Sequence, residues 1–141
     1  MKQTGKLSLA LHALGHMALD PDRPRTSEDL AMMHGTHPVV VRRVTSQLAR
    51  AGLIGTRAGA TGGAWLLAPP EAITLDRVLR AVGGCAHFGC PPPGAKGCPV
   101  GERIPQAVGR AIAAADAAAA ARLSAITVAD LLDPDQGAHA A

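Results

Sequence analysis

The segment from His37 to Leu67 restricts the possible fold of this chain more than any other. It reads HPVVVRRVTSQLARAGLIGTRAGATGGAWLL, a Val- and Arg-rich stretch followed by a glycine-rich one. Pro38 suits the first position of a helix, where its missing N–H is no loss, and Gly52 can adopt the left-handed conformation that ends one. The sequence therefore predicts a helix from about Pro38 to Ala51.

This predicted helix has one apolar and one polar face. Val, Leu and Ala side chains recur at three- and four-residue spacing, and the remaining surface carries Arg42, Arg43, Ser46, Gln47 and Arg50. Guanidinium groups can bind guanine edges or phosphates, and Gln and Ser can hydrogen-bond to bases or to the DNA backbone. The polar face therefore suits a DNA-recognition helix, although a solvated amphipathic helix has the same pattern.

The flanking segments complete a winged helix-turn-helix. Upstream, residues 26–33 begin with helix-capping residues and stop at Gly35, which leaves a short turn before the next helix. Downstream, the short stretches 53–56 and 64–67 flank the loop 57–63, whose glycines permit a tight turn and a close approach to a ligand. We therefore predict a mainly α fold with a small β wing that binds double-stranded DNA.

Composition restricts the class of protein further. The net charge of the 141-residue chain is only +3, so a basic face must come from clustering at Arg42, Arg43, Arg50 and Arg57. No segment is apolar for long enough to cross a bilayer, which predicts a cytoplasmic protein without membrane contact. No nucleophile and base stand at a useful spacing, so we do not expect an enzyme.

Further helices and one loop are predicted in the rest of the chain. Leu side chains at helical spacing indicate a helix over 7–18, and Thr74 can cap another over 75–82. We expect four parts, which are a winged helix-turn-helix domain (1–82), a cysteine-containing loop (83–101), a long helix followed by a short one (102–132) and a flexible tail (133–141).

Alanine dominates the segment from about Glu102 to Leu123, which has a strong helix propensity. Its apolar side chains repeat at alternating four- and three-residue spacing, as in a coiled coil, at Ile104, Val108, Ala111, Ala115 and Ala118. A seam with so few large side chains stabilises an isolated helix poorly. We therefore expect a homodimer through this helix, and the alternative is a helix packed within its own chain.

The chain resembles the Rrf-two (Rrf2) family of bacterial transcriptional regulators over nearly its full length. The matching text is LAL at 9–11, HPVVVRR at 37–43, AGL at 51–53, GGAWLLAPPEAITL at 62–75 and VLRAV at 78–82. The resemblance implies a dimeric winged-helix regulator, which we expect to be a repressor of an inverted-repeat operator, with its recognition helix in the major groove and its wing at the minor groove. The candidate DNA-contacting residues are His37, Val39, Arg42, Arg43, Ser46, Gln47, Arg50, Arg57, Gly59, Gly62 and Gly63.

Three cysteines stand in the predicted loop with the spacing Cys85-x4-Cys90-x7-Cys98. An odd number in a reducing compartment suits a metal or redox role better than a disulfide framework. The resemblance implies an iron–sulfur cluster on these soft thiolates, sensing redox, nitrosative or iron–sulfur status. The fourth ligand would be His12, His87, Glu102 or a residue from the first helix of the partner subunit.

Other interpretations stay open. Cys98 lies near the start of a long helix that favours its thiolate, so the alternative sensor is a cluster-free thiol switch that oxidises to a sulfenic acid or to a disulfide. The cysteines can also have no sensing role. His12 and His16, one turn apart, can bind a metal together or simply form a polar stripe. Finally, a winged helix can act as a protein-interaction module instead of a DNA reader.

Overall fold

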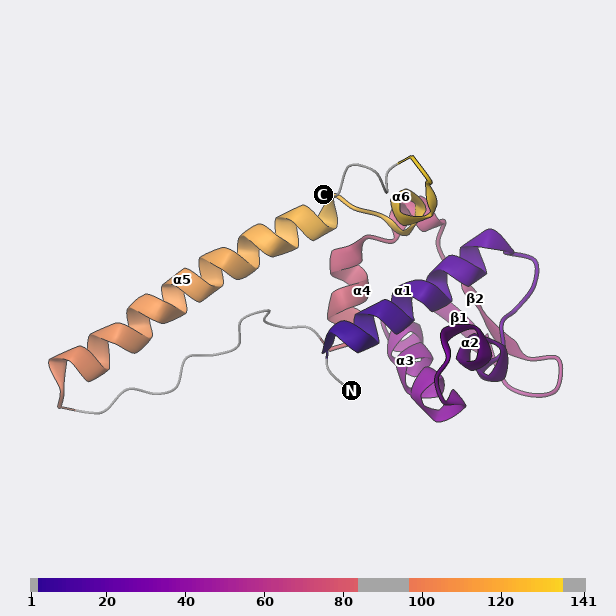
Figure 1. The fold of residues 1–141 in the computed structure, drawn as a ribbon, viewed down its shortest axis with the longest axis horizontal. Helices are drawn as coiled ribbons and strands as arrows, with labels where there is room; N and C mark the ends of the chain where they lie inside the picture. The colour runs from indigo at the N-terminus through magenta and orange to yellow at the C-terminus, as the bar shows by residue number, and fades with distance from the viewer. Residues whose placement is uncertain (1–2, 84–96, 136–141) are drawn as a thin grey trace.

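Helices make up most of the computed structural model, which describes residues 3–83 and 97–135 (Figure 1). Within these residues the order of elements is α1 (Gln3–Leu19), α2 (Ser27–His34), α3 (Pro38–Arg50), β1 (Ile54–Arg57), β2 (Gly63–Leu66), the 3-10 turn η1 (Pro70–Ala72), α4 (Leu75–Ala81), α5 (Pro99–Ser124) and α6 (Val128–Leu132). The mainly α fold with a small β wing that the sequence predicts is therefore confirmed.

The hydrophobic core forms around α1. The buried face of this helix presents Leu9, Leu14 and Met17, which have at most 1% of their surface exposed. Side chains from α3, β1, α4 and α6 complete the same cluster, with Val41, Val44, Leu48, Ile54, Val78 and Val128 among them. Because α3 places its apolar stripe in this core, its polar face is directed to solvent.

Local capping explains why α2 and α3 are two helices and not one. Thr26 and Asp29 form a capping box at the start of α2, in which each side chain accepts a hydrogen bond from the backbone N–H of the other residue. Gly35 ends α2 in the left-handed conformation at φ +69°. His37 then caps α3 through Nδ1, which accepts from the Val39 N–H at 3.2 Å, and Pro38 is the first helical residue.

The wing is an antiparallel pair in which Ile54 faces Leu66 and Arg57 faces Gly63. Both strands lie within one residue of their predicted bounds. A non-local contact fixes this position, because Arg25, just before α2, exchanges backbone hydrogen bonds of 2.9 and 2.8 Å with Ala64. The loop closes tightly at Gly62, where a Cβ atom would lie 2.1 Å from the Arg57 carbonyl oxygen.

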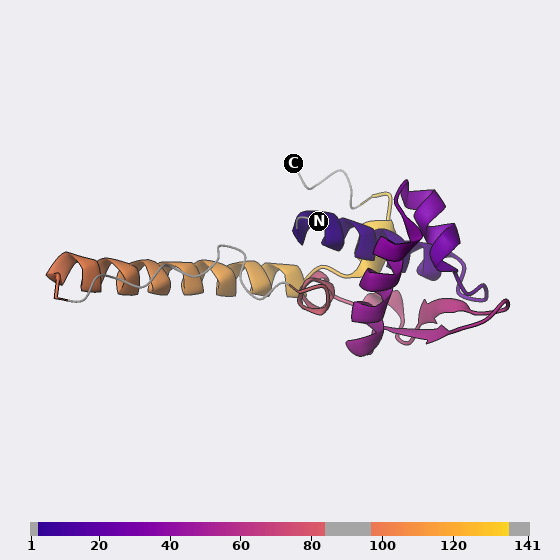
Figure 2. The same ribbon diagram turned by 90° about the horizontal axis from the view of Figure 1, so that it is seen from below.

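Helix α5 projects from the rest of the molecule as a rod (Figures 1 and 2). None of its 26 residues is buried. It contacts α4, and the chain that follows is fixed to the body by hydrogen bonds from Leu75 N to Ile126 O and from Val128 N to Ile73 O, each 2.9 Å. The short helix α6 then packs against α1. The expected long and short C-terminal helices are therefore both present.

One predicted boundary is wrong. We expected the cysteine loop to run to Gly101 and the long helix to begin at about Glu102, but α5 begins at Pro99. The Cys98 Sγ accepts a hydrogen bond from the Gly101 N–H at 3.4 Å and so acts as the N-cap, while Pro99 occupies a first-turn position that needs no N–H donor.

Within residues 3–83 and 97–135, no helix is both long and apolar enough to cross a bilayer.

Candidate nucleic-acid interface

The polar face of α3 lies on the surface, as the sequence predicts. Arg42, Arg43, Ser46 and Arg50 are exposed, and Val39 keeps 51% of its surface accessible. Gln47 differs, because it is half-buried and its Oε1 is a buried acceptor without a hydrogen-bond partner among the described residues. The exposed part of this face is therefore a row of cationic and small polar side chains.

An ion pair to α2 holds one of these arginines in place. The Arg42 guanidinium donates to Glu28 Oε1 at 2.5 Å, and both side chains are more than half exposed. A hydrogen bond to the backbone N–H of Glu28 itself lowers the pKa of this carboxyl below its usual range, and Arg42 lowers it further. Glu28 is therefore ionised at neutral pH and orients the Arg42 side chain.

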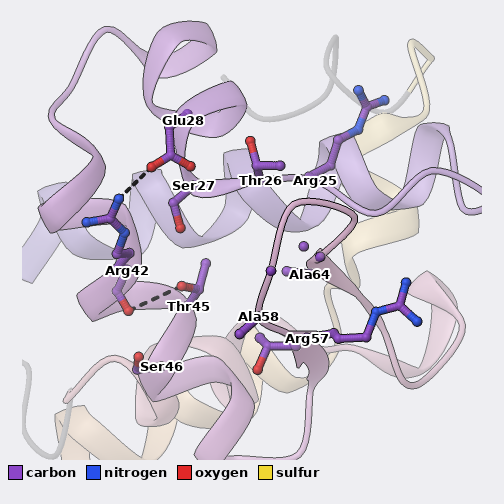
Figure 3. A pocket seen from close by; sticks show the side chains of 14 residues that line it. Arg25, Thr26, Ser27, Glu28, Arg42, Thr45, Ser46, Arg57, Ala58 and Ala64 are labelled. Carbon is purple, nitrogen blue, oxygen red and sulfur yellow. Dashed lines mark hydrogen bonds and ion pairs between the residues drawn. The ribbon is translucent and has the colours of Figure 1, made fainter.

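A cleft of about 420 Å³ separates α2 and α3 from the wing (Figure 3). Figure 3 shows Ser27 and Thr45 between Arg42 on one side and Arg57 on the other. The Arg57 guanidinium donates to the Thr61 carbonyl oxygen at 3.1 Å and so lies along the wing loop. The lining residues are Arg25, Thr26, Ser27, Glu28, Arg42, Thr45, Ser46, Thr56, Arg57, Ala58, Gly59, Gly62, Gly63 and Ala64.

The cleft joins some of the predicted DNA-contacting residues and leaves others outside it. Those that line it are Arg42, Ser46, Arg57, Gly59, Gly62 and Gly63. His37, Val39, Arg43, Gln47 and Arg50 belong to α3 or its N-cap and lie outside the lining. His37 also has a structural role, because its ring caps α3.

Sequence reasoning missed six polar residues of the cleft, which are Arg25, Thr26, Ser27, Glu28, Thr45 and Thr56. Ser27 opens α2, and helix N-termini attract phosphate groups, so this signal was present in the sequence. Thr45 is largely buried, and its hydroxyl donates to the Val41 and Arg42 carbonyl oxygens. Its position at the cleft, like that of Arg25, follows from packing between segments that are distant in sequence.

The cysteine region is described only in part. Cys85, Cys90 and His87 lie outside the described residues, whereas Cys98 is exposed at the N-terminus of α5. Glu102 lies in the same first turn, where its Oε1 accepts from the Gly97 N–H at 2.9 Å. His12 belongs to α1, and the first turn of α5 lies at the end of that helix away from α1 (Figure 1). Within one chain the structure therefore brings Glu102, but not His12, to Cys98.

His12 and His16 do not form an isolated pair. His12 contacts both His16 and His34, the last residue of α2. Burial lowers the pKa of His12, and the neighbouring His16 and His34 lower it further. In residues 3–83 and 97–135, no three His, Cys, Asp or Glu side chains are arranged about a common metal position.

Known proteins resemble this chain in sequence and in architecture. The family model Rrf2, described as "Iron-dependent Transcriptional regulator", matches residues 3–134. YwnA of Bacillus subtilis (strain 168), named as an HTH-type transcriptional regulator, is 36% identical over 108 residues, which are 73% of this chain and 76% of YwnA. A crystal structure described as a DNA-binding protein superposes with a TM-score of 0.76 at 32% identity, over 91% of this chain and 99% of that one. IscR of T. potens, at 21% identity, shares the fold with a TM-score of 0.67 over 100% of this chain and 93% of its own.

Proposed function

Because the chain belongs to the Rrf2 family of transcriptional regulators, we propose that it is a sequence-specific repressor that binds an inverted-repeat operator as a homodimer. The observation that supports this proposal is the cleft between α3 and the wing, which has Arg42 on one side and Arg57 on the other. Such a cleft suits a sugar-phosphate strand, which carries one negative charge per phosphate.

In this proposal α3 enters the major groove and the wing follows the adjacent backbone. Arg42, Arg43 and Arg50 are long enough to reach guanine edges or phosphates, and Ser46 provides a shorter hydrogen-bonding group. Ser27, at the positive end of the α2 dipole, would bind a phosphate together with the arginines of the cleft. Contacts of both kinds are needed for a protein that positions itself on DNA and also reads bases.

The exposed apolar side chains of α5 support the proposed dimer. Val100, Ile104 and Val108 keep 66%, 56% and 42% of their surfaces accessible. Helices gain most of their stability by packing an apolar face, which α5 lacks within its own chain. A second copy of α5 would cover this seam and place two copies of α3 for two half-sites.

The operator can be identified by selection from fragmented genomic DNA with the full-length protein. We expect enrichment of fragments that share an inverted repeat with half-site centres one helical turn, about 10 base pairs, or a multiple of it apart. Repression is then checked by transcription in vitro from an enriched promoter. Enrichment without any shared sequence, or unchanged transcription on an occupied promoter, would contradict a sequence-specific repressor.

We also propose that the cysteines regulate DNA binding. Cys98 suits this role because its sulfur is exposed at the N-terminus of α5, where it accepts the Gly101 N–H. A thiolate can ligate an iron–sulfur cluster with Cys85, Cys90 and Glu102, and such a cluster would supply a centre that responds to redox state or nitric oxide. The thiolate can equally be oxidised by hydrogen peroxide, which with one proton from solvent gives a sulfenic acid and water.

Anaerobic purification distinguishes the two sensors. A cluster predicts visible absorption with bound iron and sulfide, which Cys98→Ser should abolish. A thiol switch predicts a colourless protein whose operator affinity changes several-fold with peroxide, and Cys98→Ser should remove that response while leaving the affinity of the reduced protein unchanged. Ser124→Ala, at the other end of α5, is the matched control. A colourless protein that does not respond to peroxide would refute both forms of the proposal.

A further inference from the structure

Three imidazole rings meet where α1 contacts α2. His12 and His16 lie one turn apart on α1, and their Nε2 atoms are 2.8 Å apart. On the other side of the same ring, His12 Nδ1 lies 2.5 Å from Nδ1 of His34 at the end of α2. The ring centroid of His12 lies 4.6 Å from that of His16 and 4.8 Å from that of His34. All three side chains are half-buried. The rings are therefore in mutual contact and also accessible to small solutes.

One tautomer of this row leaves the Nε2 atoms of His12 and His16 as a pair that suits a cation. Each nitrogen–nitrogen contact needs one proton between the two atoms. If His12 donates its Nδ1 proton to His34, its Nε2 carries a free lone pair that faces Nε2 of His16. Two facing lone pairs repel each other unless a proton or a metal ion lies between them.

We propose that His12 and His16 bind a first-row divalent metal ion that prefers imidazole, such as Zn²⁺ or Ni²⁺, through their Nε2 atoms. Two histidines four residues apart on one helix are also the zinc-binding pair of the H-E-x-x-H motif. Imidazole nitrogens at about 2.0–2.1 Å from a tetrahedral ion lie about 3.4 Å apart, so the rings must separate by roughly 0.6 Å. A small rotation of two surface side chains achieves this separation.

His34 is the positioning residue of this site. Metal-bound histidines usually donate their second ring N–H to a neighbouring acceptor, which fixes the tautomer and the ring orientation. Nδ1 of His34 is placed to be that acceptor for His12. With two protein ligands, the other coordination positions would hold water or a small anion.

The test uses the full-length chain with Cys85, Cys90 and Cys98 replaced by serine, so that thiolates cannot bind the ion. Titration calorimetry with NiCl₂ at pH 7.5 should show one ion per chain, and His16→Gln should abolish this binding. His34→Ala should weaken the ion about 10-fold or more, as loss of an orienting partner does, and His34→Asn should restore most of the affinity because its amide oxygen can accept from His12. His139→Ala, which removes a histidine far from the row in the sequence, is the control and should bind normally.

Two results would overturn the proposal. One is the absence of nickel binding by the cysteine-free chain, which would leave the histidines as a hydrogen-bonded row only. The other is binding that survives His16→Gln in a variant whose circular dichroism matches the parent. Operator binding is measured separately, so a failure of the metal site does not affect the test of the DNA-binding proposal.

Discussion

Replacing Arg42 and Arg43 together by alanine should weaken operator binding by about 25-fold or more without unfolding the protein. Both side chains are exposed on α3, so their loss leaves no cavity in the core. A good bidentate contact between arginine and guanine contributes about 1–3 kcal/mol of discrimination, which is roughly 5- to 150-fold for each contact. Fluorescence anisotropy with a labelled operator, measured at several salt concentrations, gives both the affinity and the number of phosphate contacts.

Arg103→Ala provides the control, because it removes one arginine charge near the start of α5, away from α3. It should change the affinity less than twofold. If the double variant loses one phosphate contact, the slope of log K against log salt should decrease by about 0.9. If it still binds the operator as tightly as the parent at low salt, α3 is not the reading element and the protein-interaction alternative gains support.

Glu28 also affects the proposed interface between α3 and DNA. A carboxylate beside the cleft repels phosphate, yet its ion pair with Arg42 also fixes the direction of that guanidinium. Exposed ion pairs contribute little to stability, so in the proposed interface we expect Glu28 to affect DNA binding more than folding. The pair also links α3 to α2, since the orientation of Arg42 depends on the position of α2.

Local signals explain the parts of the structure that the sequence could predict. Pro38 and Gly52 delimit α3, because Pro38 has a fixed helical φ and needs no N–H acceptor, while Gly52 tolerates the left-handed φ of +71°. Thr26 begins α2 through contacts within four residues. Such signals depend on neighbours in the chain, which a reader of the sequence can see.

Contacts between distant segments account for most of the features that the sequence did not predict. The bridge between Arg25 and Ala64 joins the wing to the segment before α2, and no pattern within the wing itself encodes it. His34 joins His12 only because α2 packs on α1, so the sequence showed a histidine pair where the structure has a row of three. The first turn of α5 was missed because a cysteine, which is not a usual capping residue, caps it.

Introducing a negative charge into the exposed seam of α5 should convert the protein to a monomer. Ile104 and Val108 are the large side chains of this seam that the coiled-coil pattern selects, and they keep 56% and 42% of their surfaces accessible in the single chain. In a dimer, Ile104→Glu together with Val108→Glu would bury four unpaired carboxylates, each of which costs several kcal/mol to desolvate. Sedimentation velocity should therefore show a single species of about 14.3 kDa.

Gln106→Glu is the control for this variant, since position 106 lies on the opposite side of α5 from Ile104 and should leave the dimer intact. Operator affinity should decrease together with the dimer, because a monomer reaches only one half-site and loses the second set of contacts. The isolated half-site should still bind the monomer as weakly as it binds one subunit of the parent. A seam variant that sediments as a dimer would show that another surface joins the two copies, and α5 would then need a different partner for its exposed apolar side chains.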